Sequence, residues 1–79
     1  MEIVVYSRPG CGLCDQMLVD LQLELGSVDP IRVVDIRENE ALKARYGLRI
    51  PVLEIDGETL CEGRLDLSRL RAALAAGDK

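Results

Sequence analysis

The order of short strand-like and helix-like segments is the feature that most restricts the fold of this chain. Residues 3–6 form a continuous run of β-branched and aromatic side chains, which is typical of a strand buried on both faces. Turn residues follow, and apolar side chains then recur at helical spacing. Along the whole chain, these signals predict four strands and three helices. The strands are expected at residues 3–6, 31–36, 52–55 and 59–62, and the helices at residues 11–25, 38–46 and 67–77.

This order predicts an α/β fold with one mixed four-stranded sheet. The first strand–helix–strand unit should be a right-handed crossover that joins two parallel strands. Asp56-Gly57 is a strong hairpin signal, so the last two strands should run antiparallel. We expect a single domain over residues 1–79 with an aliphatic core, to which the first helix contributes Met17, Leu18, Leu21 and Leu25.

Glycine, proline and aspartate residues mark the expected ends of these elements. Gly-Ser at residues 26–27 should end the first helix, and Asp-Pro at residues 29–30 should form the turn before the second strand. Gly47 should close the second helix as its C′ residue, and Asp66 should cap the last helix.

Composition excludes several classes of function. A formal net charge of −4 disfavours nucleic acids and anionic membranes as partners, because both require a basic face. The apolar runs are too short to cross a bilayer and no secretory signal is recognisable, so we expect a cytoplasmic protein. The chain has no histidine, which removes Cys-His catalysis and His-containing zinc sites. Because a reducing compartment disfavours structural disulfides, the cysteines need another role.

The motif Cys-Gly-Leu-Cys at residues 11–14 lies where the first strand gives way to the first helix. Free backbone N–H groups and the helix dipole favour a thiolate there, so the pKa of Cys11 should lie below the free value of about 8.5. The spacing places Cys14 within bonding reach. We therefore expect Cys11 to attack disulfides and the more buried Cys14 to resolve them. Gly12 leaves room for a partner, Leu13 offers an apolar contact, and Arg8 adds a positive charge.

Two other interpretations of the cysteine pair remain open. The motif could supply half of a zinc site, but a structural zinc needs four ligands and only Cys61 is left to contribute. The two cysteines could also be inert core residues, although their place at a loop-to-helix junction favours reactivity. A CxxC motif beside a strand–helix–strand unit is typical of redox proteins, so we expect a thiol–disulfide function with no bound metal or cofactor.

Three segments resemble the glutaredoxin family. Residues 5–14, Val-Tyr-Ser-Arg-Pro-Gly-Cys-Gly-Leu-Cys, resemble its active-site segment, in which a strand leads into Lys-Pro-Gly-Cys-Pro-Tyr-Cys. Ile50-Pro51-Val52 resembles its Thr-Val-Pro segment, and Asp56-Gly57 resembles its hairpin. The resemblance covers nearly the whole chain. It implies a minimal thioredoxin fold whose strands lie in the order second, first, third, fourth, with the first and third helices on one face and the second helix on the other.

The resemblance also assigns roles to residues. It implies that Cys11 is the nucleophile, that Cys14 is the resolving thiol, and that Pro51 follows a cis peptide bond and packs beside the pair. The backbone of Ile50 would then pair with an extended substrate, a form of β-augmentation. Protein disulfides or glutathione would be the substrates, and a reductase would recharge the pair. We expect the chain to be a monomer.

The sequence departs from the glutaredoxin pattern at positions that bear on glutathione. Gly-Leu replaces the usual residues between the cysteines, which leaves the redox potential open. The glycine pair that approaches glutathione has no clear match near Gly63, and Glu62 would oppose an anionic carboxylate there. Arg8 and Arg49 supply positive charge on the other side. Glutathione, as a co-substrate, and protein disulfides both remain candidates.

Two alternative functions come from the same resemblance. One is an iron–sulfur or metal carrier, in which Cys11 of two chains and two glutathione molecules would hold a cluster. The other is a non-catalytic thioredoxin-like binding module, which would have no need of two thiols so placed.

Cys61 is a third thiol whose position depends on the hairpin register. A two-residue turn at 56–57 places Glu58 opposite Ile55 and Cys61 opposite Val52. We therefore expect Cys61 at the active-site end of the sheet, as a peripheral thiol that is dispensable for turnover. Cys61 is either a third redox thiol near the pair or an ordinary strand cysteine, and the second interpretation is favoured because free cysteine is a common small hydrophobe in cores.

Overall fold

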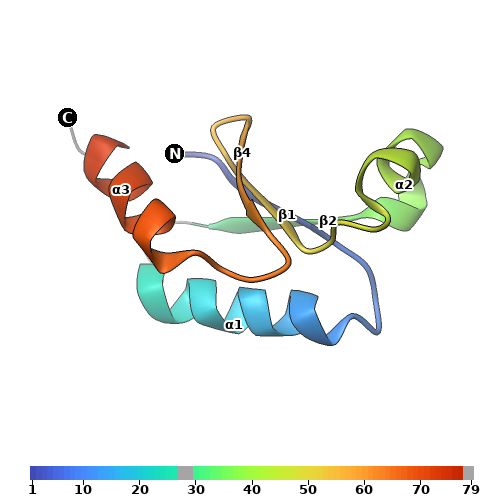
Figure 1. Cartoon of the computed structure of the whole chain (residues 1–79), viewed down its shortest axis with the longest axis horizontal. Helices are drawn as coiled ribbons and strands as arrows, with labels where there is room; N and C mark the ends of the chain where they lie inside the picture. The colour runs from blue at the N-terminus through green and yellow to red at the C-terminus, as the bar shows by residue number, and fades with distance from the viewer. Residues whose placement is uncertain (27–29, 78–79) are drawn as a thin grey trace.

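The computed structural model describes residues 1–26 and 30–77. Its strands are β1 (Ile3–Ser7), β2 (Ile31–Asp35), β3 (Val52–Ile55) and β4 (Glu58–Glu62), and its helices are α1 (Gly12–Leu25), α2 (Glu40–Tyr46) and α3 (Leu67–Gly77) (Figure 1). The sheet has the order β2-β1-β3-β4, with β2 parallel to β1 and the other neighbours antiparallel. This topology confirms the predicted fold class and strand order. Within the described residues, no helix has the length and apolar character that a membrane span requires.

The helices cover opposite faces of the sheet. Along β1, Ile3 and Val5 belong to the core under α1 and α3, whereas Tyr6 on the alternate face packs with residues of α2. In Figure 1, α1 lies below the sheet and α2 lies above it near the right-hand end. The predicted apolar stripe of α1 is confirmed, since three of its members are buried and the fourth packs partly buried against them: Met17, Leu21, Leu25 and Leu18.

Side-chain caps determine where α2 begins. The sequence predicts a helix from residue 38, but Ile36–Glu38 form a separate 3-10 turn and α2 starts at Glu40. The Asp35 carboxylate accepts a hydrogen bond from the N–H of Arg37, which starts the turn and ends β2 one residue earlier than predicted. The Asn39 side chain then accepts bonds from two N–H groups in the first turn of α2.

Gly47 closes α2 in a conformation that differs from the predicted one. A C′ glycine is usually left-handed, but Gly47 is right-handed, with φ −51° and ψ −37°. Close approach explains the glycine, because a Cβ atom here would lie 2.6 Å from the carbonyl oxygen of Lys43. Two other predicted helix ends are confirmed: Gly26 ends α1 with φ 64°, and the Asp66 side chain caps α3. Residue 27 of the predicted helix end and residue 29 of the turn predicted at 29–30 lie outside the described residues.

The β3–β4 hairpin contains a bulge that the sequence does not predict. Asp56 and Gly57 both have positive φ, 51° and 85°, as a two-residue turn requires. The register then shifts, so that Cys61 pairs with Leu53 and not, as predicted, with Val52. Paired residues share a face, so Cys61 lies in the core under α1 and α3, where burial raises the pKa of its thiol. The predicted register opposite Val52 is therefore wrong, whereas the interpretation of Cys61 as an ordinary core cysteine is confirmed.

Candidate functional site

Cys11 and Cys14 are joined by a disulfide at the start of α1. Their Cα atoms lie 5.2 Å apart, within the range that a disulfide spans without backbone movement. Cys11 is the N-cap residue, and its Sγ accepts a hydrogen bond from the Cys14 N–H at 3.2 Å. Cys14 is fully buried and Cys11 is half-buried, so the pair has one sulfur within reach of a partner and one that is covered.

The segment between β1 and α1 leaves Cys11 half-buried, with open space beside it. β1 ends at Ser7, and Gly10 turns the chain with φ 79°, a conformation that favours glycine. On the first turn of α1, the position of a Gly12 Cβ has no atom within 4 Å, and 49% of Leu13 is exposed. The dipole and the free N–H groups of this 14-residue helix put positive potential at Cys11. That potential favours a thiolate once the disulfide is reduced.

Pro51 stands at the same end of the sheet as the disulfide. The Ile50–Pro51 peptide bond is cis, as the resemblance implies, and Pro51 is buried. Val52 pairs with Tyr6, so Pro51 lies level with the point where the chain leaves β1 toward the cysteines. The Pro51 carbonyl accepts a hydrogen bond from the Gly63 N–H at 2.8 Å, which ties the end of β4 to this edge.

Arg49 is paired with Glu62 at this edge. Its guanidinium donates to the Glu62 carboxylate at 2.7 and 2.9 Å and lies over the Tyr46 ring, 5.5 Å from the centroid. The sequence suggests that these two charges act on an anion from different sides, but the structure joins them. Arg8 is exposed on the loop before Cys11 and makes no ion pair with any residue that the structure describes.

A buried carboxylate held by two tyrosines packs on the opposite face of the sheet from α1, and sequence analysis does not identify it. Glu54 of β3 is only 9% exposed and accepts hydrogen bonds from the hydroxyls of Tyr6 at 3.1 Å and Tyr46 at 2.9 Å. The two rings are stacked, with centroids 4.3 Å apart. Burial and the bond to Glu54 raise the pKa of Tyr6 to about 12 and also raise the pKa of Tyr46. One sequence signal could have indicated this cluster: a glutamate stands within an otherwise apolar strand and would need hydrogen-bond donors if buried, and the chain has only two tyrosines.

The backbone of Tyr46 connects this cluster with the disulfide end of the sheet. Its carbonyl oxygen accepts hydrogen bonds from the N–H groups of Arg49 at 2.8 Å and Ile50 at 3.1 Å. The loop that leads to Pro51 is therefore anchored to the residue that Glu54 holds. In residues 1–26 and 30–77, no group of three or more Cys, His, Asp or Glu side chains is placed to hold a metal ion.

Known proteins share the sequence pattern and the fold of this chain. The Glutaredoxin-like domain (DUF836) matches residues 2–75. Protein Ne2328 of Nitrosomonas europaea, solved by NMR, is 35% identical with a TM-score of 0.82, and the match covers 91% of this chain and 88% of that one. The uncharacterized protein Rv0508 of Mycobacterium tuberculosis is 32% identical over 94% of this chain and 82% of its own length. Glutaredoxin C1 of Populus tremula x tremuloides, 20% identical with a TM-score of 0.54 over 94% of this chain and 74% of its own, shares the fold alone.

Proposed function

Because this chain belongs to the Glutaredoxin-like domain family (DUF836) and has a thioredoxin fold, we propose that it is a thiol–disulfide oxidoreductase working through the Cys11–Cys14 couple. The observation that best supports this proposal is the pairing of an accessible and a buried sulfur at a helix N-terminus. Free N–H groups and the positive end of the dipole stabilise a thiolate at that position. The thiolate is the form of cysteine that attacks disulfides.

Exchange proceeds in two steps, and in each step one S–S bond forms and one breaks. The Cys11 thiolate of the reduced protein attacks a substrate disulfide, so that a mixed disulfide forms and the other substrate sulfur leaves as a thiolate. Cys14 loses its proton to that thiolate or to water and attacks the Cys11 Sγ. The Cys11–Cys14 disulfide forms, and the second substrate sulfur leaves as a thiolate. The substrate gains two electrons and the protein loses two.

The substrates that we propose are protein disulfides and glutathione disulfide. Gly12 and Leu13 leave the Cys11 sulfur open to both, and the backbone at Ile50 and Pro51 offers an edge to an extended chain.

Two arginines could contact an anionic substrate such as glutathione. Arg8 is exposed on the loop before the motif. Arg49 could reach a substrate carboxylate by exchanging its partner Glu62, and because both side chains are partly exposed, at 40% and 45%, that exchange costs about 1 kcal/mol or less.

We propose that the protein works in a reducing cytoplasm. A reductase would return two electrons to the Cys11–Cys14 disulfide in each cycle, and the monomeric chain would need no bound cofactor. The net charge of −4 favours proteins and small thiols over nucleic acids or anionic membranes as partners.

Trapping of mixed disulfides tests the two cysteine roles. Reduced Cys14→Ser should form a stable mixed disulfide with glutathione or a protein disulfide, because nothing resolves the bond at Cys11. Cys11→Ser should form none, because the remaining sulfur of the pair is buried. Cys61→Ser is the matched control, since it removes a buried cysteine outside the pair. Equal trapping by the first two variants, read by mass spectrometry, would rule out the assignment.

A further inference from the structure

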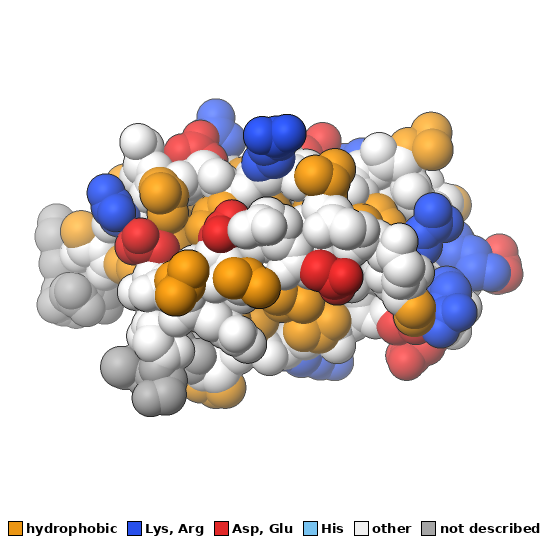
Figure 2. Space-filling model, turned by 90° about the horizontal axis from the view of Figure 1, so that it is seen from below, with side chains coloured by type: hydrophobic (Ala, Val, Ile, Leu, Met, Phe, Trp, Pro, Cys, Tyr) orange, Lys and Arg blue, Asp and Glu red, His pale blue; other side chains and the backbone are white. Residues whose placement is uncertain are grey.

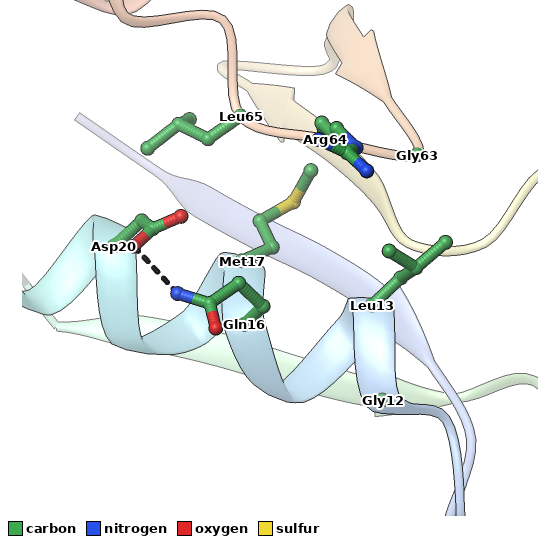
Figure 3. Close-up of a pocket in the computed structure, with 8 residues that line it drawn as sticks. All are labelled: Gly12, Leu13, Gln16, Met17, Asp20, Gly63, Arg64 and Leu65. Atoms are coloured by element: carbon green, nitrogen blue, oxygen red, sulfur yellow. Dashed lines mark hydrogen bonds between the residues drawn. The ribbon is translucent and has the colours of Figure 1, made fainter.

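A groove of about 470 Å³ begins beside the cysteine motif and follows α1. One wall is the first half of α1, and the other is the segment Gly63–Leu65 that follows β4. In Figure 3, Met17 points from α1 toward Leu65 and Arg64, and because it is only 1% exposed it forms the floor of the groove, whereas Leu13 lies at the end nearest Gly63. Gly12 also lines this end, so the groove begins at the residue that follows Cys11 in the chain.

A second hollow of about 290 Å³ continues the groove along α1. The two hollows share Asp20 and Leu65, and the second adds Leu23 and Leu67, which are 79% and 40% exposed. From Leu13 to Leu23 the helix rises by about 15 Å, the length of four to five residues in an extended chain at about 3.3 Å each. Figure 2, which views the molecule from the side of α1, shows hydrophobic side chains grouped across the middle of this face.

Opposite charges stand at the two ends of the first hollow. Arg64 lies toward the Leu13 end in Figure 3, is exposed, and makes no ion pair with any described residue, whereas Arg69 and Arg71 nearby on α3 are both paired. Asp20 lies farther along α1 and is hydrogen-bonded to Gln16 at 2.9 Å, without a cationic partner among the described residues. The hollow therefore offers a free positive charge, then an apolar stretch, then a negative charge.

We propose that this groove binds an extended segment of the substrate protein on one side of its reactive cysteine. The segment would place an acidic residue opposite Arg64 and a large apolar side chain against Leu65, which is half-buried, or against Leu13, which is 49% exposed. This inference rests on the proposed exchange at Cys11, and it names protein disulfides as the substrate class that the chain selects. Glutathione is a tripeptide, too short to fill a groove that accommodates four to five extended residues beyond the sulfur.

Cysteine peptides that carry a thionitrobenzoate leaving group test the proposal. The Cys11 thiolate of reduced Cys14→Ser attacks the peptide sulfur, the Cys11–peptide disulfide forms, and thionitrobenzoate leaves as a coloured thiolate. Three peptides are compared: one with Glu and Leu beside the cysteine, one with Lys and Leu, and one with Glu and Ala. At low salt we expect the Glu-Leu peptide to react about three- to fivefold faster than the Lys-Leu peptide, and about tenfold faster than the Glu-Ala peptide.

A charge reversal locates the preference in the groove. Arg64→Glu, made in the same Cys14→Ser chain, should favour the Lys-Leu peptide over the Glu-Leu peptide. Arg32→Glu changes the net charge equally, but Arg32 is exposed on the far edge strand β2, so this control should keep the original preference. Circular dichroism checks that both variants are folded.

The outcomes separate the groove from the exchange itself. Hydroxyethyl thionitrobenzoate disulfide, which has no peptide, reports the chemistry at Cys11 alone. If it reacts but the peptides show no preference, or if Arg32→Glu changes the preference as much as Arg64→Glu, the groove proposal is wrong and the proposed function stands. If neither this probe nor any peptide reacts, both are wrong. A dimer in solution that Arg64→Glu dissociates would assign the groove to a second copy of the chain and would also overturn the proposal.

Discussion

Tyr46→Phe tests how much the hydrogen bond from Tyr46 to the buried Glu54 carboxylate stabilises the fold. The substitution removes one of the two hydroxyls that donate to Glu54, at 2.9 Å, and leaves the other, from Tyr6, in place. The ring of Tyr46 is only 2% exposed and stacks on Tyr6, and phenylalanine preserves both its burial and its stacking. The expected loss is therefore that of one hydrogen bond to a buried charged group.

The magnitude follows from that single bond. A hydrogen bond to a charged group contributes about 1.5–3 kcal/mol, so we expect Tyr46→Phe to lower the free energy of unfolding by about 2 kcal/mol. For a domain of this length, each kcal/mol lowers Tm by about 4–8 °C, which gives a loss of about 8–16 °C. Glu54→Gln provides the control background. A neutral bond contributes only about 0.5–1.5 kcal/mol, so Tyr46→Phe should cost less there.

Four chains are compared: the wild type, Tyr46→Phe, Glu54→Gln and the double variant. Urea unfolding, followed by circular dichroism with the disulfide intact, measures the loss of unfolding free energy that Tyr46→Phe causes with and without the charge of Glu54. A loss below about 0.5 kcal/mol for Tyr46→Phe would refute the reasoning, because it is smaller than the contribution of a single neutral hydrogen bond. An equal loss in the Glu54→Gln background would show that the charge of Glu54 plays no part.

Three further predictions concern titration and charge. The alkylation rate of reduced Cys11 should report a pKa below about 8.5, because of the helix N-terminus, and a value at or above it would contradict that effect. The folded pKa of Tyr6, about 12, exceeds the unfolded value of 10.0, so its contribution to stability is complete below about pH 10 and is lost as the pH rises toward 12. Unfolding by urea at several alkaline pH values checks this, and unchanged stability up to pH 12 would contradict it. Glu62→Gln should release Arg49 and lower the KM for glutathione disulfide about two- to fivefold, whereas an unchanged KM would place Arg49 outside the site.

Sequence reasoning predicted those parts of the fold and site that depend on local signals. The element order followed from periodicity and turn residues that lie within each segment. The motif at residues 11–14 places Cys11 at the start of the first helix with Cys14 within bonding reach, and the structure agrees, with Cys11 as the N-cap and Cys14 in the first turn. Ile50-Pro51 was identified by resemblance, and its cis bond is confirmed.

The features that were missed depend on contacts between distant segments. Tyr6 and Glu54 are 48 residues apart, and only the pairing of β1 with β3 brings them together. Arg49 and Glu62 meet because the end of β4 is tied to Pro51. The bulge in the β3–β4 hairpin adds one residue to β4 and so turns Cys61 toward the core. The alternation of apolar and polar residues over a strand of four or five residues is too short to reveal such a shift.

Equilibrium redox titration of the Cys11–Cys14 couple tests the central claim most directly. The chain is equilibrated with glutathione or dithiothreitol at graded ratios of oxidised to reduced form, quenched, and analysed for alkylated thiols by mass spectrometry. We predict one reversible two-electron transition with a slope of about 30 mV per tenfold change, unaltered by Cys61→Ser and absent in Cys11→Ser. A pair that stays oxidised or reduced at every ratio, or a transition that Cys61→Ser removes, would contradict the account.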